Sequence, residues 1–194
     1  MTFFTSRQER RLWLRVAVVV VAIYSTLGLA QSLAVVLRDF GMLSDLMWLS
    51  LFLMLAAIVI QGLKKRRSRI EIGVMLGIFG VYLLMFGRMA GPEERSHMIE
   101  YSVVAIFILE ALRERARNGR RVRLLPLFAI LATILIGTID ECIQLVLPSR
   151  VFDLFDILFD SLAAVMAVSA SVALGWIRRR VEKLRERRSR SRAQ

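Results

Sequence analysis

The chain has 194 residues, of which 57% are hydrophobic, and this length leaves room for one compact domain. Its net charge of +12 suggests a nucleic-acid partner, but the 28 basic residues are confined almost entirely to the two chain ends and two connecting stretches, which argues against nucleic acid. The single cysteine, Cys142, excludes an intramolecular disulfide and a zinc site with paired cysteines, and no nucleotide-binding loop or serine-triad motif is present.

Apolar stretches recur along the whole chain, and about 20 apolar residues suffice to cross a bilayer as a helix. The pattern predicts an all-α fold, a polytopic transmembrane helical bundle of about six spans. We place the spans at Leu12–Leu33, Asp45–Leu63, Ile70–Gly87, His97–Leu112, Leu124–Leu147 and Phe155–Ile177. Residues 1–177 would form a single transmembrane helical domain, and residues 178–194 a basic cytoplasmic tail.

The first span follows three arginines and has features of a secretory signal peptide, with Gly28-Leu29-Ala30 as the candidate cleavage-site motif. Its apolar run is long and continues to Leu37, which favours retention. We therefore expect the first span to remain as a membrane helix.

Basic residues fill the stretch between the second and third spans and the stretch between the fourth and fifth. Cytoplasmic loops carry an excess of Lys and Arg, so both stretches and both chain termini are predicted to be cytoplasmic. The basic tail after Trp176 would meet anionic lipid head groups or would only anchor the topology. Most acidic residues follow the opposite pattern, which places the polar side chains of the spans towards the outer leaflet.

His97, Glu100 and Tyr101 open the fourth span, and their spacings of three and four residues put them on one helical face. A histidine near the outer surface can titrate near neutral pH or bind a metal. We interpret this face as part of a functional site. The alternative is that His97 is only an interfacial polar residue at the start of a helix.

Asp140, Glu141 and Gln144 interrupt the apolar run of the fifth span. A charged side chain within a membrane helix costs about 2.5–3.5 kcal/mol on insertion scales, so it marks a functional-site candidate. Asp140 lies roughly 12 Å inward of Pro148 at 1.5 Å per residue. At that depth we expect either a functional pocket or a hydrogen-bond network that holds helices together.

Asp156 and Asp160 follow in the sixth span, four residues apart, where two like charges repel. The repulsion must be compensated by Arg150 in the preceding turn, by Arg88 at the end of the third span, by a bound cation or by protonation of one acid. An arginine fork binds a carboxylate or a phosphate, so both arginines are also candidates for holding an anionic group. Carboxylates with a histidine could bind a divalent cation, and proton sharing would explain the same residues.

These residues, in this order, resemble the VanZ-like family of membrane proteins, named after a teicoplanin-resistance protein, over a core of residues 88–175. The segment from His97 to Tyr101 looks like the family's His-x-x-x-Tyr block. The second block is an Asp-Glu pair, a Gln three residues later, a Pro-x-Arg turn and an Asp in the next helix, here Asp140, Glu141, Gln144, Pro148, Arg150 and Asp156. Asp160 stands where the family has asparagine, and Ala163 stands where it has glycine.

The resemblance implies a small, multi-pass protein of the bacterial cytoplasmic membrane, linked to low-level teicoplanin resistance without a known chemistry. The leading hypothesis is an outward-facing acidic pocket that binds or modifies a lipid head group or a lipid-linked cell-wall precursor, with membrane lipids or a lipoglycopeptide as partners. Alternatives are a proton- or ion-coupled small transporter and a non-catalytic protein that shields the envelope. Candidate catalytic residues are His97, Glu100, Asp140, Glu141, Asp156 and Asp160, and candidate substrate-binding residues are Arg88, Tyr101, Gln144 and Arg150.

Overall fold

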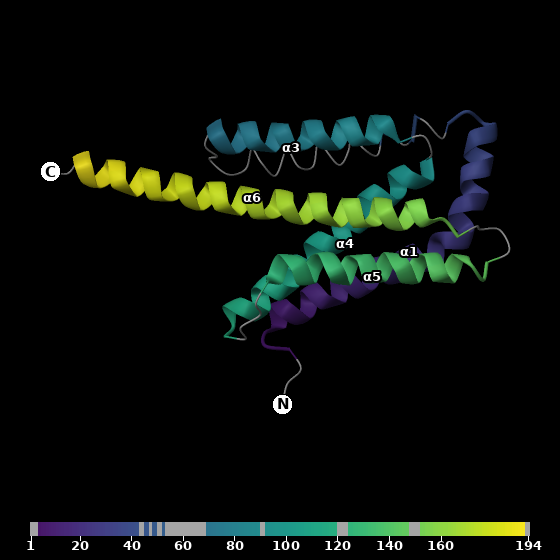
Figure 1. Cartoon of the computed structure of the whole chain (residues 1–194), viewed down its shortest axis with the longest axis horizontal. Helices are drawn as coiled ribbons and strands as arrows, with labels where there is room; N and C mark the ends of the chain where they lie inside the picture. Colours follow the sequence, from purple (N-terminus) through teal and green to yellow (C-terminus); the bar gives the residue numbers. More distant parts are fainter. Residues whose placement is uncertain are drawn as a thin grey trace. The chain divides into compact units, whose positions relative to one another are not determined.

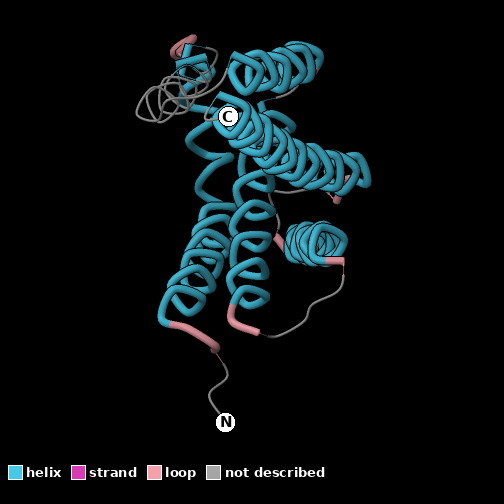
Figure 2. The backbone as a smooth tube through the Cα atoms, turned by 90° about the vertical axis from the view of Figure 1, so that its left-hand side faces the viewer, coloured by secondary structure: helices cyan, strands magenta, loops and turns pink. Residues whose placement is uncertain are grey.

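The computed structural model describes residues 4–42, 45–46, 48–49, 52, 69–89, 92–119, 124–147 and 152–192; within these, the side chains of residues 28–34, 69, 92–94, 185 and 187–192 are not described. The regular elements of this part of the chain are all α-helices, as predicted (Figure 1). Figure 2 shows the same helices as a smooth tube. They are α1 (Arg7–Asp39), α3 (Arg69–Arg88), α4 (Pro92–Arg117), α5 (Leu125–Gln144) and α6 (Leu154–Arg192).

Local sequence determines where several helices begin and end. The Ser6 hydroxyl accepts the N–H of Glu9 at 2.9 Å and caps the start of α1. After α4, Gly119 has a φ of +90°, a left-handed conformation that glycine adopts without strain. The Asp153 carboxylate accepts the N–H of Phe155 at 2.8 Å and caps the start of α6. These caps fix the positions from which the helices present their polar side chains.

The chain divides into two compact units, which are described separately. Unit 1 comprises residues 1–43 and 91–169, and unit 2 comprises residues 44–90 and 170–194. The first part of α6, up to Ser169, therefore belongs to unit 1, and the remainder belongs to unit 2.

The core of unit 1 is built around α4, which packs against both α1 and α5. Its buried face carries Val104, Ala105, Ile108 and Leu109, and α1 adds Val16 and Ile23. From the unit 1 part of α6 the buried hydrophobic residues are Ala163, Ala164, Ala167 and Val168, of which three are alanines. Small side chains let helix backbones approach closely, which is how membrane helices pack in the absence of a hydrophobic driving force between them.

Unit 2 holds α3 and the C-terminal part of α6. Trp48 packs edge-to-face against Phe86 of α3 with ring centroids 5.7 Å apart, and the Arg180 guanidinium lies 5.1 Å from the ring centroid of Trp176. Helix α6 runs through the predicted end of the sixth span at Ile177 and continues to Arg192. The basic tail is therefore helical there, because Arg, Lys and Glu are good helix formers although they are not apolar.

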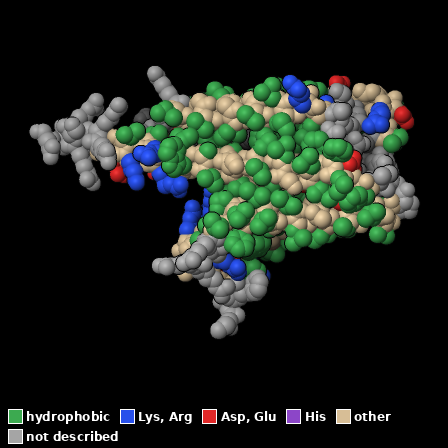
Figure 3. Space-filling model, viewed as in Figure 1, with side chains coloured by type: hydrophobic (Ala, Val, Ile, Leu, Met, Phe, Trp, Pro, Cys, Tyr) green, Lys and Arg blue, Asp and Glu red, His purple; other side chains and the backbone are tan. Residues whose placement is uncertain are grey.

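Within the described residues, three helices are long and apolar enough to cross a membrane: Ile70–Arg88, Leu125–Gln144 and Leu154–Leu184. Their large hydrophobic side chains are widely exposed, and Figure 3 shows hydrophobic side chains over most of the visible face. A soluble protein rarely exposes contiguous apolar surface on this scale. The chain is therefore a membrane protein, as predicted, and these segments match the third, fifth and sixth predicted spans.

The other predicted spans are tested less directly. The second, Asp45–Leu63, lies mostly outside the described residues, and in the first the side chains of residues 28–34 are not described. The fourth corresponds to α4, in which Glu100 and Glu110 interrupt the apolar run within one membrane length. Helix α4 buries its apolar face inside unit 1 instead of presenting it outward.

Candidate functional site

Polar side chains from three helices of unit 1 meet in one buried group, here called the polar cluster. Helix α4 contributes from its first turns, α5 from its last turns and α6 from its first turns. The members are His97 and Tyr101 of α4, Asp140, Glu141 and Gln144 of α5, and Asp156 and Asp160 of α6. All are buried except Asp156, which is partly exposed. Residues predicted separately on three spans thus form one site.

The carboxylate of Asp160 orients the imidazole ring of His97. Its Nδ1 atom lies 3.0 Å from Asp160 Oδ1, and both side chains are buried. An ionised carboxylate can only accept, so the proton of the imidazole is assigned to Nδ1. The lone pair of a neutral imidazole is then on Nε2, which lies 4.0 Å from Asp156 Oδ2.

The two aspartates of α6 that were expected to repel each other lie on either side of one imidazole. Asp160 contacts Nδ1 of His97, and Asp156 faces Nε2 of the same ring. The sequence suggested Arg150, Arg88, a cation or a proton as the compensating partner. The structure adds His97 to these, because a histidine on another helix lies between the two acids.

Glu141 is oriented by two donors. The Gln144 side-chain amide donates to Glu141 Oε1 at 2.8 Å, and the backbone N–H of Asp153 donates to Oε2 at 3.1 Å. The first donor lies one turn along α5, and the second lies in the segment that leads into α6. These two hydrogen bonds fix the Glu141 carboxylate near His97 and Asp156. One carboxylate oxygen of Glu141, one ring nitrogen of His97 and one carboxylate oxygen of Asp156 all lie within 4.8 Å of one another.

Tyr101 lies on α4 between the polar cluster and the apolar core of unit 1. Its hydroxyl donates to Asp140 Oδ2 at 2.9 Å, and its ring stacks on that of His97 with centroids 5.8 Å apart and an interplanar angle of 12°. The next buried residues of α4 towards the core are apolar, beginning with Val104 and Ala105. Tyr101 thus separates the polar cluster from the apolar part of unit 1.

A glycine that sequence reasoning missed determines how closely α5 and α6 approach. A Cβ atom at Gly137 would overlap Asp160 Oδ2 and would lie 3.0 Å from Asp160 Cβ. That Oδ2 atom is buried, and no residue of the described part of the chain hydrogen-bonds to it. The residue before Gly137 links α5 to α1: the backbone carbonyl of Ile136 accepts a hydrogen bond of 2.8 Å from the Tyr24 hydroxyl. The only sequence signal for Gly137 is its position one turn before Asp140.

Two other predicted site residues, Glu100 and Arg88, are among the described residues. Glu100 is partly buried on α4, one turn from His97. Arg88 is exposed at the end of α3 and belongs to unit 2, and Arg150 lies outside the described residues. The substrate-binding roles of the two arginines therefore stay predictions.

A second polar group, also missed by sequence reasoning, joins α1 to the end of α4. Glu9 is fully buried; its carboxylate accepts the N–H of Thr5 at 2.7 Å and Nε of Arg115 at 2.8 Å. Burial alone would raise the pKa of Glu9, but the hydrogen bonds from Thr5 and the charge of Arg115 outweigh it, so the pKa is lowered from 4.5. The signal in the sequence is the capping pair of Ser6 and Glu9. Arg115 lies roughly 27 Å from His97 along α4 at 1.5 Å per residue, so this group is not part of the polar cluster. Its contacts hold the start of α1 against the end of α4.

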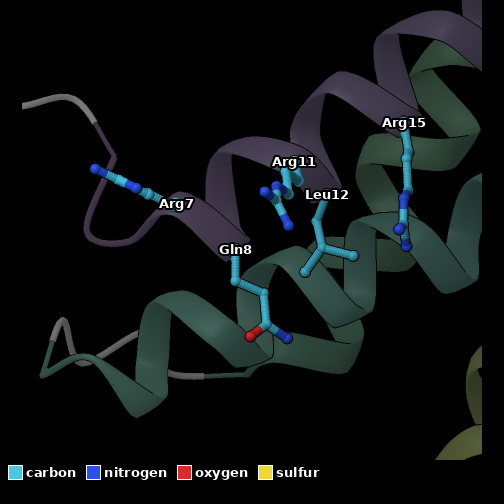
Figure 4. Close-up of a pocket in the computed structure, with 5 residues that line it drawn as sticks. All are labelled: Arg7, Gln8, Arg11, Leu12 and Arg15. Carbon is cyan, nitrogen blue, oxygen red and sulfur yellow. The ribbon is translucent and has the colours of Figure 1, made fainter.

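The start of α1 also carries a surface pocket of about 380 Å³ lined by Arg7, Gln8, Arg11, Leu12 and Arg15. Figure 4 shows Gln8 and Leu12 directed towards the neighbouring helix and Arg7 pointing away from it. The lining residues all come from α1 and lie at the end of α4 opposite the polar cluster. Because its lining is made of residues of the basic start of α1, we assign no reaction to this pocket.

No family model matches the chain, no curated protein is similar to it, and no solved structure matches its fold. The similarity to the VanZ-like family therefore stays a prediction from the two sequence blocks. What can be argued about function depends on the geometry of the polar cluster.

Proposed function

We propose that the protein is a multi-pass protein of the bacterial cytoplasmic membrane whose polar cluster binds or modifies a polar lipid head group or a lipid-linked cell-envelope precursor at the outer leaflet. The observation that carries this proposal is the buried hydrogen bond of 3.0 Å between His97 and Asp160. Ionisable groups within membrane helices are expensive, and they are retained where they perform a function.

The arrangement of charge in unit 1 supports the outward position of the cluster. The ion pair between Glu9 and Arg115 brings the start of α1, with its arginines, to the end of α4. The basic stretch that links α4 to α5 begins at the same end, whereas the cluster lies at the start of α4. Because basic residues favour the cytoplasmic side, the cluster would face outward.

The chemistry that the cluster could perform is proton transfer. With Asp160 holding the proton on Nδ1, His97 Nε2 can accept a proton from water or from a substrate hydroxyl, as an oriented imidazole does in general base catalysis. The carboxylates of Glu141 and Asp156 lie near the same nitrogen atom and would stabilise the positive charge that develops on the ring. Phosphate and sugar hydroxyl groups of envelope lipids are substrates for this kind of chemistry.

A proton-coupled transporter is less well supported. A relay needs titratable groups across the membrane, but the buried face of α4 beyond Tyr101 consists of Val104, Ala105, Ile108 and Leu109. On α5 the buried Thr133 hydroxyl donates to a carbonyl of its own helix, that of Ala129, at 2.8 Å. Neither helix therefore offers a chain of proton carriers from the cluster to the opposite end of unit 1.

The test is teicoplanin susceptibility of a Gram-positive host that expresses wild type, Asp156→Asn, His97→Ala or the control Glu110→Gln at equal membrane levels. We expect wild type and the control to protect and both cluster variants to fail. Mass spectrometry of extracted lipids and lipid-linked precursors then identifies a product that is present only with wild type and the control. Equal protection by all four proteins, with identical lipid profiles, would refute a functional cluster.

A further inference from the structure

We propose that the polar cluster is a divalent metal centre in which His97 Nε2 and one carboxylate oxygen each from Glu141 and Asp156 are the ligands. The proposal deepens and rests on the proposed function, with one change: Nε2 bound to an ion has no lone pair left for a proton, so a water on the ion would take over the proton transfer. The binding of a metal can be measured without any activity. A transition-metal ion of the zinc class fits the donor set best.

The geometry of the three donor atoms supports this assignment. They come from three different helices, and all lie within 4.8 Å of one another. Zinc–nitrogen and zinc–oxygen bonds are about 2.0–2.2 Å long, so donor atoms around one tetrahedral ion lie about 3–4 Å apart. Small rotations of the Asp156 side chain, which is the most exposed of the three, would bring the donor atoms to that separation.

The hydrogen bond that His97 makes with Asp160 is of the kind that orients histidine ligands in metal sites. A metal-bound histidine usually donates its other N–H to a carboxylate, which fixes the ring and raises its basicity. Asp160 provides this carboxylate at 3.0 Å from Nδ1. In the described part of the chain, His97 Nε2 lies 4.0 Å from Asp156 Oδ2, beyond hydrogen-bond distance, so its lone pair can be directed to a ligand in the cluster.

The Glu141 carboxylate is also oriented by hydrogen bonds from groups that would not contact the metal. Both of its oxygens accept a hydrogen bond, one from Gln144 and one from the backbone of Asp153, which leaves the second lone pair of each oxygen for a metal. The two carboxylates would repel each other at this distance, and a dication offsets that repulsion. The structure thus contains three convergent donors, of which two are held in place by groups that do not themselves reach the ion.

The donor set also limits the identity of the metal. An imidazole nitrogen favours zinc, copper, iron and nickel, whereas Mg²⁺ and Ca²⁺ prefer oxygen ligands alone. Three protein ligands leave a fourth position open on a tetrahedral ion, which is the arrangement of catalytic and not of structural zinc. Water or a phosphate oxygen of a lipid head group would take that position.

The test is zinc binding by the full chain, purified in detergent with an affinity tag that contains no histidine and stripped with a chelator. Isothermal titration calorimetry with ZnCl₂ should show that wild type and the control Glu110→Gln each bind one zinc ion per chain. His97→Ala, Glu141→Gln and Asp156→Asn should each lose this site. Asp160→Asn should keep the stoichiometry but bind roughly 10–100-fold more weakly, because it changes only the partner of a ligand.

A second measurement does not depend on the folding of any variant. The chain contains a single histidine, so wild-type protein labelled with ¹⁵N-histidine gives the signals of one imidazole. Zinc should shift the Nε2 resonance and leave Nδ1 protonated, whereas MgCl₂ should leave both unchanged. Absence of zinc binding by well-folded wild type, or an unchanged Nε2 resonance, would overturn the proposal.

The outcome can be separated from that of the proposed function. Zinc binding without any change in lipids or in susceptibility would retain the metal centre and reject the lipid role. A lipid product formed equally well by chelator-stripped and zinc-loaded protein would retain the lipid role and reject the metal as a participant.

Discussion

Gly137 of α5 and Asp160 of α6 lie so close together that a Cβ atom at position 137 would force the Asp160 side chain or the backbone to move. Asp160 also contacts His97 Nδ1 at 3.0 Å, so a displacement of Asp160 would move the carboxylate that orients the imidazole. The glycine is therefore part of the construction of the site, although it carries no functional group of its own.

The first prediction concerns this contact. Gly137→Ala should destabilise the protein by roughly 1–3 kcal/mol, because overpacking forces the backbone or Asp160 to move. It should also weaken zinc binding. The matched control is Gly77→Ala in α3, where an added Cβ atom meets nothing within 4 Å. That change should leave stability unchanged or raise it by up to about 1 kcal/mol, because alanine is the better helix former.

Thermal unfolding in detergent, followed by circular dichroism, compares the two alanine variants. The expectation is a lower Tm for Gly137→Ala and an equal or higher one for Gly77→Ala. A Gly137→Ala protein with the Tm and the zinc affinity of wild type would show that the close approach has no structural consequence.

The second prediction concerns Tyr101 and Asp140. Tyr101→Phe removes the donor of a buried hydrogen bond of 2.9 Å, and this should cost roughly 1–3 kcal/mol of unfolding free energy. A double-mutant cycle with Asp140→Ala should give a coupling energy of about 1 kcal/mol. Zinc affinity should stay near that of wild type, because neither residue is a proposed ligand. Additive effects in the cycle would mean that the contact contributes nothing.

The third prediction concerns Glu9, which lies before the first predicted span. Its pKa is lower in the folded protein than the 4.5 of a free side chain. The folded state therefore binds fewer protons than the unfolded state as Glu9 titrates. The stability that Glu9 contributes is fully present above about pH 4.5 and is lost as the pH falls through the folded pKa.

Glu9→Gln should accordingly have a lower Tm than wild type at pH 7, and the difference should shrink below pH 4.5. The matched control is Glu110→Gln, whose carboxylate pairs with Arg113 at 2.6 Å on a partly exposed face. Such surface pairs contribute at most about 1 kcal/mol, so the control should differ little from wild type at either pH. A difference between Glu9→Gln and wild type that does not change with pH would contradict the assignment.

Hydropathy predicted the helical class and the core of several helices but not their ends. The fifth span was predicted at Leu124–Leu147, and α5 is Leu125–Gln144. The sixth was predicted to end at Ile177, but α6 continues to Arg192. Hydropathy reports where a helix can contact lipid, whereas backbone hydrogen bonding continues through residues such as Arg and Glu that favour helices.

The polar cluster was predictable in its membership but not in its pairings. Buried acids stand out in apolar runs, so Asp140, Glu141 and Asp160 could be found from sequence alone. Which acid contacts His97 depends on the rotation and the depth of two helices that are far apart in the sequence. The role of Glu9 could not be seen either, because its partner Arg115 is one of many arginines and lies 106 positions away.

The order of the helices along the chain has a consequence for biosynthesis. His97 and Glu141 emerge from the ribosome before Asp156 and Asp160, which lie on α6. Until that helix is inserted, the imidazole and the acids of α5 have been delivered to the membrane without the carboxylate that orients them. Completion of the site thus waits for the insertion of α6, although most of its polar side chains have been synthesised before that helix.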